Sequence, residues 1–239
     1  MKLDTRVYPD LDALSRAAVE EVLRVVAESV AALGRCAIAL SGGRTPARMY
    51  ALCASEYNAQ TPWDRVHLFW GDERFVPQND PRSNYHMARE ALITRVPIPA
   101  ANVHPVPTNF SQPQQAADAY EAELQKFFGS AQPAFDVQLL GLGGEGHTAS
   151  LFPGSPALEE KKRWVAAVCV PAEPPDRLTL TPVVFNCGRN TFFLVAGEDK
   201  RKILSALRRE PDSKISEYPA ARIRPSGRVL WFLDQAAAG

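Results

Sequence analysis

The sequence predicts an open α/β fold, with a mainly parallel, twisted sheet that is flanked by helices on both faces. Short apolar runs alternate with amphipathic segments along the chain, and several of the runs stop at glycines. Continuous apolar runs are typical of strands covered on both faces, as in parallel sheets. With 239 residues, 46% of them hydrophobic, the chain can bury one substantial core, so we expect a single domain over residues 1–239.

The spacing of apolar residues predicts the individual elements. Steps of three and four predict a long helix over residues 10–33 that ends at Gly34, and Ser83 is the expected N-cap of a helix over 83–93. Further helices are expected over residues 114–128, 181–187 and 199–208. Six strands are expected over residues 36–43, 65–73, 134–144, 164–171, 190–197 and 228–234. The proline-rich segment 95–113 is predicted to be a long surface loop.

Charge and composition exclude several classes of partner. The formal net charge is zero, so the chain has no excess of basic residues to attract nucleic acid or an anionic membrane. No apolar stretch approaches the roughly 20 residues that span a bilayer, and acids interrupt the N-terminal segment where a signal peptide would need an apolar run. The four cysteines form no CxxC pair, which predicts buried free thiols without a zinc site or disulfides. These features predict a cytoplasmic protein with a small-molecule partner.

Four loops at the ends of predicted strands are the candidate ligand-binding segments, because open α/β sheets bind ligands beyond the carboxyl ends of their strands. They read SGGRTP, GDERFVP, GLGGEGH and AGEDK. In the first loop, two glycines precede Thr45 and Pro46, a preferred N-cap and a first-turn residue. Free N–H groups at that helix terminus would suit a phosphate, although an ordinary tight turn would give the same spacing.

His147 is the leading candidate for proton transfer. It follows three glycines at a strand end, whereas His67, His86 and His104 lie in a strand, a helix and the proline-rich loop. Imidazole exchanges protons near neutral pH, and Glu145 could hold its tautomer or raise its basicity. The alternative is a histidine that only caps local backbone groups. The chain has no GxSxG or HExxH motif and no cysteine beside a histidine, which disfavours serine hydrolases and metalloenzymes.

Charged residues near other strand ends are weaker candidates. Lys200 is expected in the first turn of a helix, where it opposes the helix dipole, and Arg177 could offer a planar fork to phosphate. Taken alone, each is more simply interpreted as a solvated surface residue. Asp72, Glu73 and Arg74 form either a catalytic group or a local salt-bridge cluster.

Five segments together resemble the 6-phosphogluconolactonases, relatives of the glucosamine-6-phosphate deaminases. The segments LSGGRTP, WGDERFVPQNDPRSNYHMA, GLGGEGHTASLFPG, DRLTLTP and GEDKRKIL occur in the order and approximate spacing of that family. The resemblance runs from about residue 39 to about residue 225, and GHTASLFPG is its most specific part. It implies a Rossmann-like fold similar to that of the deaminases and of ribose-5-phosphate isomerase.

The resemblance also implies an activity, which is hydrolysis of 6-phospho-D-glucono-1,5-lactone without a metal or organic cofactor. It implies a catalytic group of His147, Glu145 and Arg74. The implied substrate-binding residues are Ser41, Gly42, Gly43, Thr45, Asp72, Glu73, Gly143, Gly144, Arg177 and Lys200. The expected partner is the phosphorylated lactone alone, with no nucleic acid and no membrane, and a monomer is favoured.

The chain departs from the family pattern at two positions, and two other functions stay open. The family usually has aspartate where this chain has Glu145, and often lysine where it has Glu173. A glucosamine-6-phosphate deaminase is the first alternative, but those enzymes supply a glutamate after the histidine, where this chain has Leu151 and Phe152. The second alternative is a phosphosugar-sensing module, which would be expected to carry a DNA-binding segment and to lack the histidine.

Overall fold

The computed structural model describes residues 3–129, 132–209 and 217–239, and its centre is a six-stranded sheet. The strands are β1 (Thr5–Tyr8), β2 (Cys36–Leu40), β3 (Val66–Trp70), β5 (Val137–Leu140), β8 (Asn190–Val195) and β9 (Arg228–Asp234). Their order is β1-β9-β8-β5-β2-β3, and every neighbouring pair is parallel. All residues of β2 and β5 are buried, as strands covered on both faces require, and β5 includes the polar Gln138.

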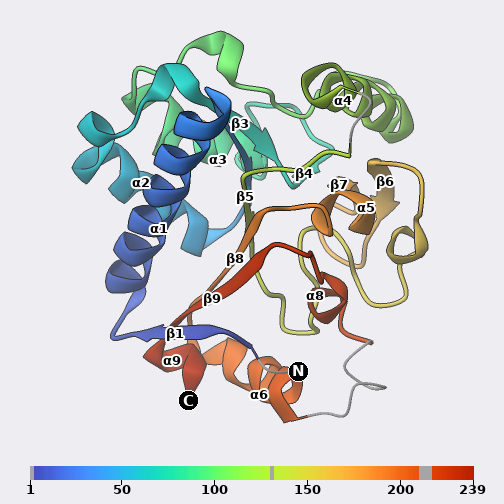
Figure 1. Ribbon diagram of the computed structural model, residues 1–239. Helices are drawn as coiled ribbons and strands as arrows, with labels where there is room; N and C mark the ends of the chain where they lie inside the picture. Colours follow the sequence, from blue (N-terminus) through green and yellow to red (C-terminus); the bar gives the residue numbers. More distant parts are fainter. Residues whose placement is uncertain (1–2, 130–131, 210–216) are drawn as a thin grey trace.

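Helices cover both sides of this sheet. They are α1 (Leu11–Leu33), α2 (Arg44–Glu56), α3 (Asn84–Ala91), α4 (Pro113–Phe128), α5 (Pro182–Phe185), α6 (Arg201–Arg209), α8 (Pro219–Arg222) and α9 (Gln235–Ala238). Figure 1 shows α1 and α2 on one side of β5, β8 and β9, with α4, α5 and α8 on the other. The predicted fold class is therefore confirmed.

Two predicted helix boundaries are confirmed by their capping contacts. The Ser83 side chain accepts a hydrogen bond from the backbone N–H of His86 at the start of α3. Gly34 ends α1 in the left-handed conformation, with φ of 76°, and its N–H donates to the Val30 carbonyl. The proline-rich segment is a loop, as predicted, with a short 3₁₀ turn at Ala100–Asn102.

A second, three-stranded antiparallel sheet corrects the predicted strand set. It contains β4 (Asp72–Arg74), β7 (Asp176–Leu180) and β6 (Val165–Cys169), in the order β4-β7-β6. The strand expected over 164–171 belongs to this sheet, and the end of the strand expected over 65–73 is a separate strand after Gly71. Sheet membership was not predictable from apolarity, because a run such as Val165–Cys169 has the same composition in either sheet.

Two strands were missed because their sequences are weakly apolar. β1 is a four-residue edge strand with the sequence TRVY, so it has no continuous apolar run. Its Val7 is 50% exposed, as an edge position allows. β7 mixes charged, polar and apolar residues and directly follows two prolines, so it gives no clear strand pattern.

Three local predictions were also wrong. Gly43 is the N-cap of α2, so Thr45 lies inside the first turn. Lys200 ends a 3₁₀ turn that precedes α6, and it is not in the first turn of that helix. Of the four cysteines only Cys36 is buried, and Cys169 is exposed on its strand. No helix in the described part of the chain is long and apolar enough to cross a membrane.

Candidate active site

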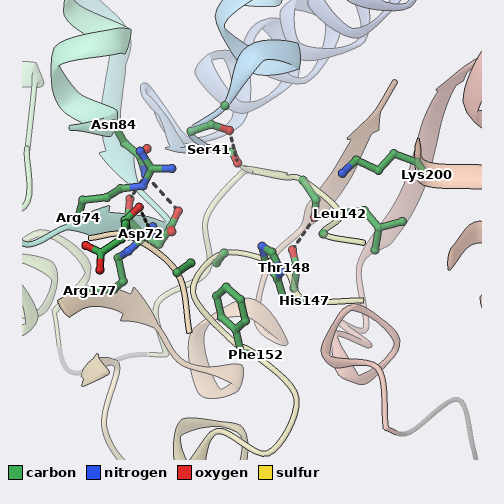
Figure 2. Close-up of a pocket in the computed structure, with 17 residues that line it drawn as sticks. Ser41, Asp72, Arg74, Asn84, Leu142, His147, Thr148, Phe152, Arg177 and Lys200 are labelled. Carbon is green, nitrogen blue, oxygen red and sulfur yellow. Dashed lines mark hydrogen bonds between the residues drawn. The ribbon is translucent and has the colours of Figure 1, made fainter. Parts of the chain in front are cut away.

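A pocket of about 410 Å³ lies beyond the carboxyl ends of β8, β5, β2 and β3, which are neighbours in the large sheet. The loops after these four strands, together with the segment before β7 and the start of β7, supply its polar wall, part of which Figure 2 shows. Among the predicted site residues, those that line it are Ser41, Gly42, Gly43, Asp72, Arg74, Gly143, His147, Arg177 and Lys200. Thr45, Glu73, Gly144 and Glu145 do not line it.

The loop between β2 and α2 forms the wall at the start of a 13-residue helix. The Tyr50 hydroxyl donates to the carbonyl of Ser41 (2.9 Å) and accepts from its N–H (3.0 Å), which fixes the loop. Gly43 offers no side-chain cap, so the first N–H groups of α2 remain open toward the pocket. Such a helix terminus favours an anion.

His147 is held in a defined position by its own loop. Gly143 donates its N–H to the carbonyl of His147 (2.8 Å), and the imidazole stacks on Phe152 with ring centroids 4.0 Å apart. A Cβ on Gly143 would lie 2.0 Å from His147 Nδ1, so only glycine allows this approach. Ala149, two residues on, has a φ of 48°, a strained value for alanine in a loop that lines the pocket.

Glu145 lies beside the imidazole, as the sequence predicts, but in poor hydrogen-bond geometry. Its Oε2 is 3.2 Å from His147 Nδ1, yet that buried nitrogen forms no hydrogen bond of acceptable direction. Burial raises the pKa of Glu145, but a hydrogen bond from its own backbone and the charge of His147 outweigh this, so the pKa is lowered overall. Glu145 is therefore a carboxylate near neutral pH.

Asp72 is a buried carboxylate fixed by two residues that the sequence analysis did not single out. Ser150 Oγ donates to Asp72 Oδ2 (2.7 Å), and Asn84 Nδ2 donates to the Asp72 backbone carbonyl (2.9 Å). Asn84 also packs against Gly42, where a Cβ would lie 2.0 Å from its Oδ1. Asn84 thus connects the glycine loop to Asp72. Asn84 and Ser150 lie inside two of the segments that resemble the family, and that position is the signal that could have pointed to them.

Glu73 points away from the pocket that Asp72 and Arg74 line. Its side chain is 1% exposed and accepts hydrogen bonds from Ser83 Oγ (3.0 Å) and from the backbone N–H groups of Asn84 and Tyr85 (2.7 Å each). These donors lie at the beginning of α3, so Glu73 anchors that helix rather than facing the pocket.

Cationic side chains occupy two opposite parts of the pocket wall. Figure 2 shows Arg74 and Arg177 together on one side of His147, with Lys200 on the other. Arg177 is only 6% exposed, whereas Lys200 is 24% exposed and its Nζ lies 2.9 Å from the Asp199 carboxylate. Arg177 and Lys200, both implied to bind substrate, thus lie on different parts of the wall.

A family model described as glucosamine-6-phosphate isomerases/6-phosphogluconolactonase matches residues 9–231. The chain belongs to this family. The family resemblance seen in the motifs is thereby confirmed.

Several members of the family are similar over nearly the whole chain. A 6-phosphogluconolactonase of Nostoc sp. is 42% identical, over 99% of this chain and 98% of the relative. A 6-phosphogluconolactonase of Mycobacterium tuberculosis is 38% identical, over 100% and 98%. The solved 6-phosphogluconolactonase from Trypanosoma cruzi superposes with a TM-score of 0.88 at 31% identity, covering 99% of this chain and 96% of that one. A monomeric glucosamine-6-phosphate deaminase, at 18% identity and TM-score 0.80, shares the fold.

Proposed function

We propose that this chain hydrolyses 6-phospho-D-glucono-1,5-lactone to 6-phospho-D-gluconate, the second step of the oxidative pentose phosphate pathway. The observation that carries the proposal is His147, held at the strand ends in a pocket with cationic groups on both sides. The 6-phosphogluconolactonases at 42% and 38% identity support it.

His147 acts as the general base in the proposed reaction. Its Nδ1 is buried, which leaves Nε2 to face a water in the pocket. Nε2 takes a proton from that water as the water oxygen bonds to the lactone carbonyl carbon. The bond from this carbon to the ring oxygen then breaks, and His147 returns the proton to the departing oxygen. The ionised Glu145 stabilises the imidazolium between the two transfers.

The two cationic regions have different functions in the proposed reaction, phosphate binding and oxyanion stabilisation. The open N–H groups of α2 and the Lys200 ammonium hold the remote phosphate, which fixes the pose of the ring. Arg74 faces the carbonyl and stabilises the oxyanion that forms there. No step needs a metal or organic cofactor, and we propose that the enzyme uses none.

The residues after the histidine disfavour the deaminase alternative. Leu151 is fully buried and Phe152 stacks on the His147 ring, so this region provides packing where the deaminases supply a glutamate. The pocket side of the loop therefore lacks the additional acid.

The test is lactone hydrolysis, with the substrate generated in solution and its loss measured near neutral pH against the spontaneous background. For His147→Ala we expect kcat to fall by about 10²- to 10⁴-fold with little change in KM, because a general base contributes that much. The matched control is His86→Ala, on α3 outside the pocket wall, which should keep wild-type kcat. A chelator should leave the wild-type rate unchanged.

Near-normal turnover by His147→Ala would remove the histidine from the mechanism. No acceleration by folded wild type would overturn the lactonase assignment, and ammonia release from glucosamine 6-phosphate would be tested next.

A cytoplasmic location is a further proposal, supported by the unpaired cysteine pattern and testable by cell fractionation.

A further inference from the structure

Arg74 and Arg177 form a like-charged cross-strand pair. Arg74 on β4 lies directly opposite Arg177 on β7 in the antiparallel register. Like charges in such positions destabilise a sheet. An anion bound between the two guanidinium groups would relieve this repulsion.

The contacts of the two guanidinium groups do not supply that anion. Arg74 Nη1 donates to the Arg82 carbonyl, and Arg177 donates from Nε to the Pro174 carbonyl and from Nη2 to the Glu173 carbonyl. No carboxylate of the described residues lies within ion-pair distance of either group. Arg74 Nε is buried without a hydrogen-bond partner. Arg74 Nη2 and Arg177 Nη1 have no hydrogen-bond partner among the described residues and are not buried, so they can bind a ligand.

The surroundings of the pair strengthen its demand for negative charge. Burial, and then the charge of Arg74, lower the pKa of Arg177, whereas the charges of Asp72, Glu73 and Glu173 act in the opposite direction. The Asp72 and Glu73 carboxylates are already hydrogen-bonded to Ser150 and to the start of α3. Arg177 is 6% exposed, so the pair is a built site in the pocket wall.

The pair lies across His147 from Lys200 within the same cavity (Figure 2). A phosphorylated lactone carries one anionic group, its phosphate. Hydrolysis of the ester bond creates a second, the carboxylate at the former carbonyl carbon. A pocket with two separate cationic regions around the base therefore matches the charges of the ring-opened product.

We propose that the Arg74–Arg177 pair binds the carboxylate that the reaction creates, so that the pocket recognises linear phosphorylated aldonates as two-anion ligands. This inference rests on the proposed function. Planar guanidinium groups match a carboxylate geometrically, and the phosphate stays with Lys200 and the start of α2. The product then competes with the lactone for the same pocket.

Calorimetric titration with three probes tests the proposal without turnover. The probes are 6-phosphogluconate, glucitol 6-phosphate, in which CH₂OH replaces the carboxylate, and inorganic phosphate as the shared-anion reference. For the wild type we expect 6-phosphogluconate to bind about 10- to 100-fold more tightly than glucitol 6-phosphate, the effect of charge-assisted hydrogen bonds.

The variants assign each anion to its site. Arg177→Gln and Arg74→Gln should bring this affinity ratio close to one with the Kd of glucitol 6-phosphate unchanged, whereas Lys200→Gln should weaken both ligands equally. Arg65→Gln makes the same charge change at a side chain that is 58% exposed and outside the pocket, and should keep the wild-type ratio. If Arg177→Gln does not fold, Arg177→Lys and Arg74→Gln decide, because the lysine keeps the charge without the fork.

Equal affinities for both sugars in the wild type would overturn this inference. Loss of glucitol 6-phosphate binding in Arg177→Gln would also overturn it, by placing the phosphate on the arginine pair. If the wild type hydrolyses the lactone while either result holds, only this inference fails. A folded wild type that neither hydrolyses the lactone nor binds any probe would sink the proposed function as well.

Discussion

The imidazole of His147 lies between an aromatic ring and a glycine. Phe152 stacks on one side at 4.0 Å, and the Gly143 backbone closes against Nδ1. The stacking contact and the close approach of Gly143 together hold the ring in place. Catalysis by a positioned base depends on such placement, because a shift of about 1 Å can cost 100-fold in rate.

Gly143→Ala should therefore lower kcat by about 100-fold. The added Cβ would meet Nδ1 at 2.0 Å, so the ring must move. Gly144→Ala is the matched control, because a Cβ there meets nothing within 4 Å. Steady-state kinetics and thermal melts of both variants check this. Wild-type kcat in a folded Gly143→Ala variant would show that the ring position is not critical.

At the scale of elements, the outer edge of the large sheet is closed by the proline-rich loop. The N–H of His104 donates to the Leu68 carbonyl on β3 (2.8 Å), and Val103 forms a bridge with Leu68. His104 Nε2 lies 3.2 Å from His67 Nδ1, and its Nδ1 lies 2.9 Å from Glu123 Oε1. The loop thus covers an edge strand that would otherwise expose unpaired backbone groups.

This contact predicts a loss of stability in mild acid. Burial, the facing His104 and the charge of Arg35 lower the pKa of His67 to about 4. Burial also lowers the pKa of His104, although Glu123 opposes this and Lys126 adds to it. An unfolded histidine binds its proton near pH 6.5, so the unfolded state gains protons first, and stability falls as the pH drops from about 6.5 toward 4.

Thermal melts across that pH range measure the effect. The wild-type Tm should fall by several degrees, and His67→Gln should show a shallower fall because one buried neutral imidazole is gone. His86→Gln, outside the cluster, should keep the wild-type slope. Parallel pH profiles for the wild type and His67→Gln would contradict the assignment.

At the scale of the whole molecule, Gly71 links the two sheets directly by backbone hydrogen bonds. Gly71 donates its N–H to the Leu40 carbonyl of β2 (2.8 Å), and its own carbonyl accepts from Leu180 of β7 (2.8 Å). Residues of both sheets, such as Phe193 and Leu178, belong to one continuous cluster of buried side chains. This continuity supports the proposed single domain.

The chain should accordingly unfold in one cooperative transition. Calorimetric and van't Hoff enthalpies should agree, and far-UV circular dichroism should coincide with tryptophan fluorescence. Trp164 reports on the small sheet, next to β6, and Trp70 on the large one. Two separated transitions would show that the sheets fold as separate domains. Light scattering on the same sample should give the mass of one chain, as the proposed monomer requires.

The sequence by itself determined the buried strands and the loops that surround the pocket. Strands covered on both faces need continuous apolar runs, and close approach at their ends needs glycines such as Gly143. Both requirements are local, so a single pass along the chain could detect them. Ser41, His147 and Lys200 were found because they follow such runs.

Only the tertiary structure decided which of these residues face the pocket and on which part of its wall each one lies. In the structure, Glu73 contacts the start of α3, and Ser150, 78 residues away in sequence, binds Asp72. Arg177 lies on the other side of the pocket from Lys200. It also separated the small antiparallel sheet from the large parallel one. Strand register and long-range hydrogen bonds set these relations, and neither leaves a periodic signal in the sequence.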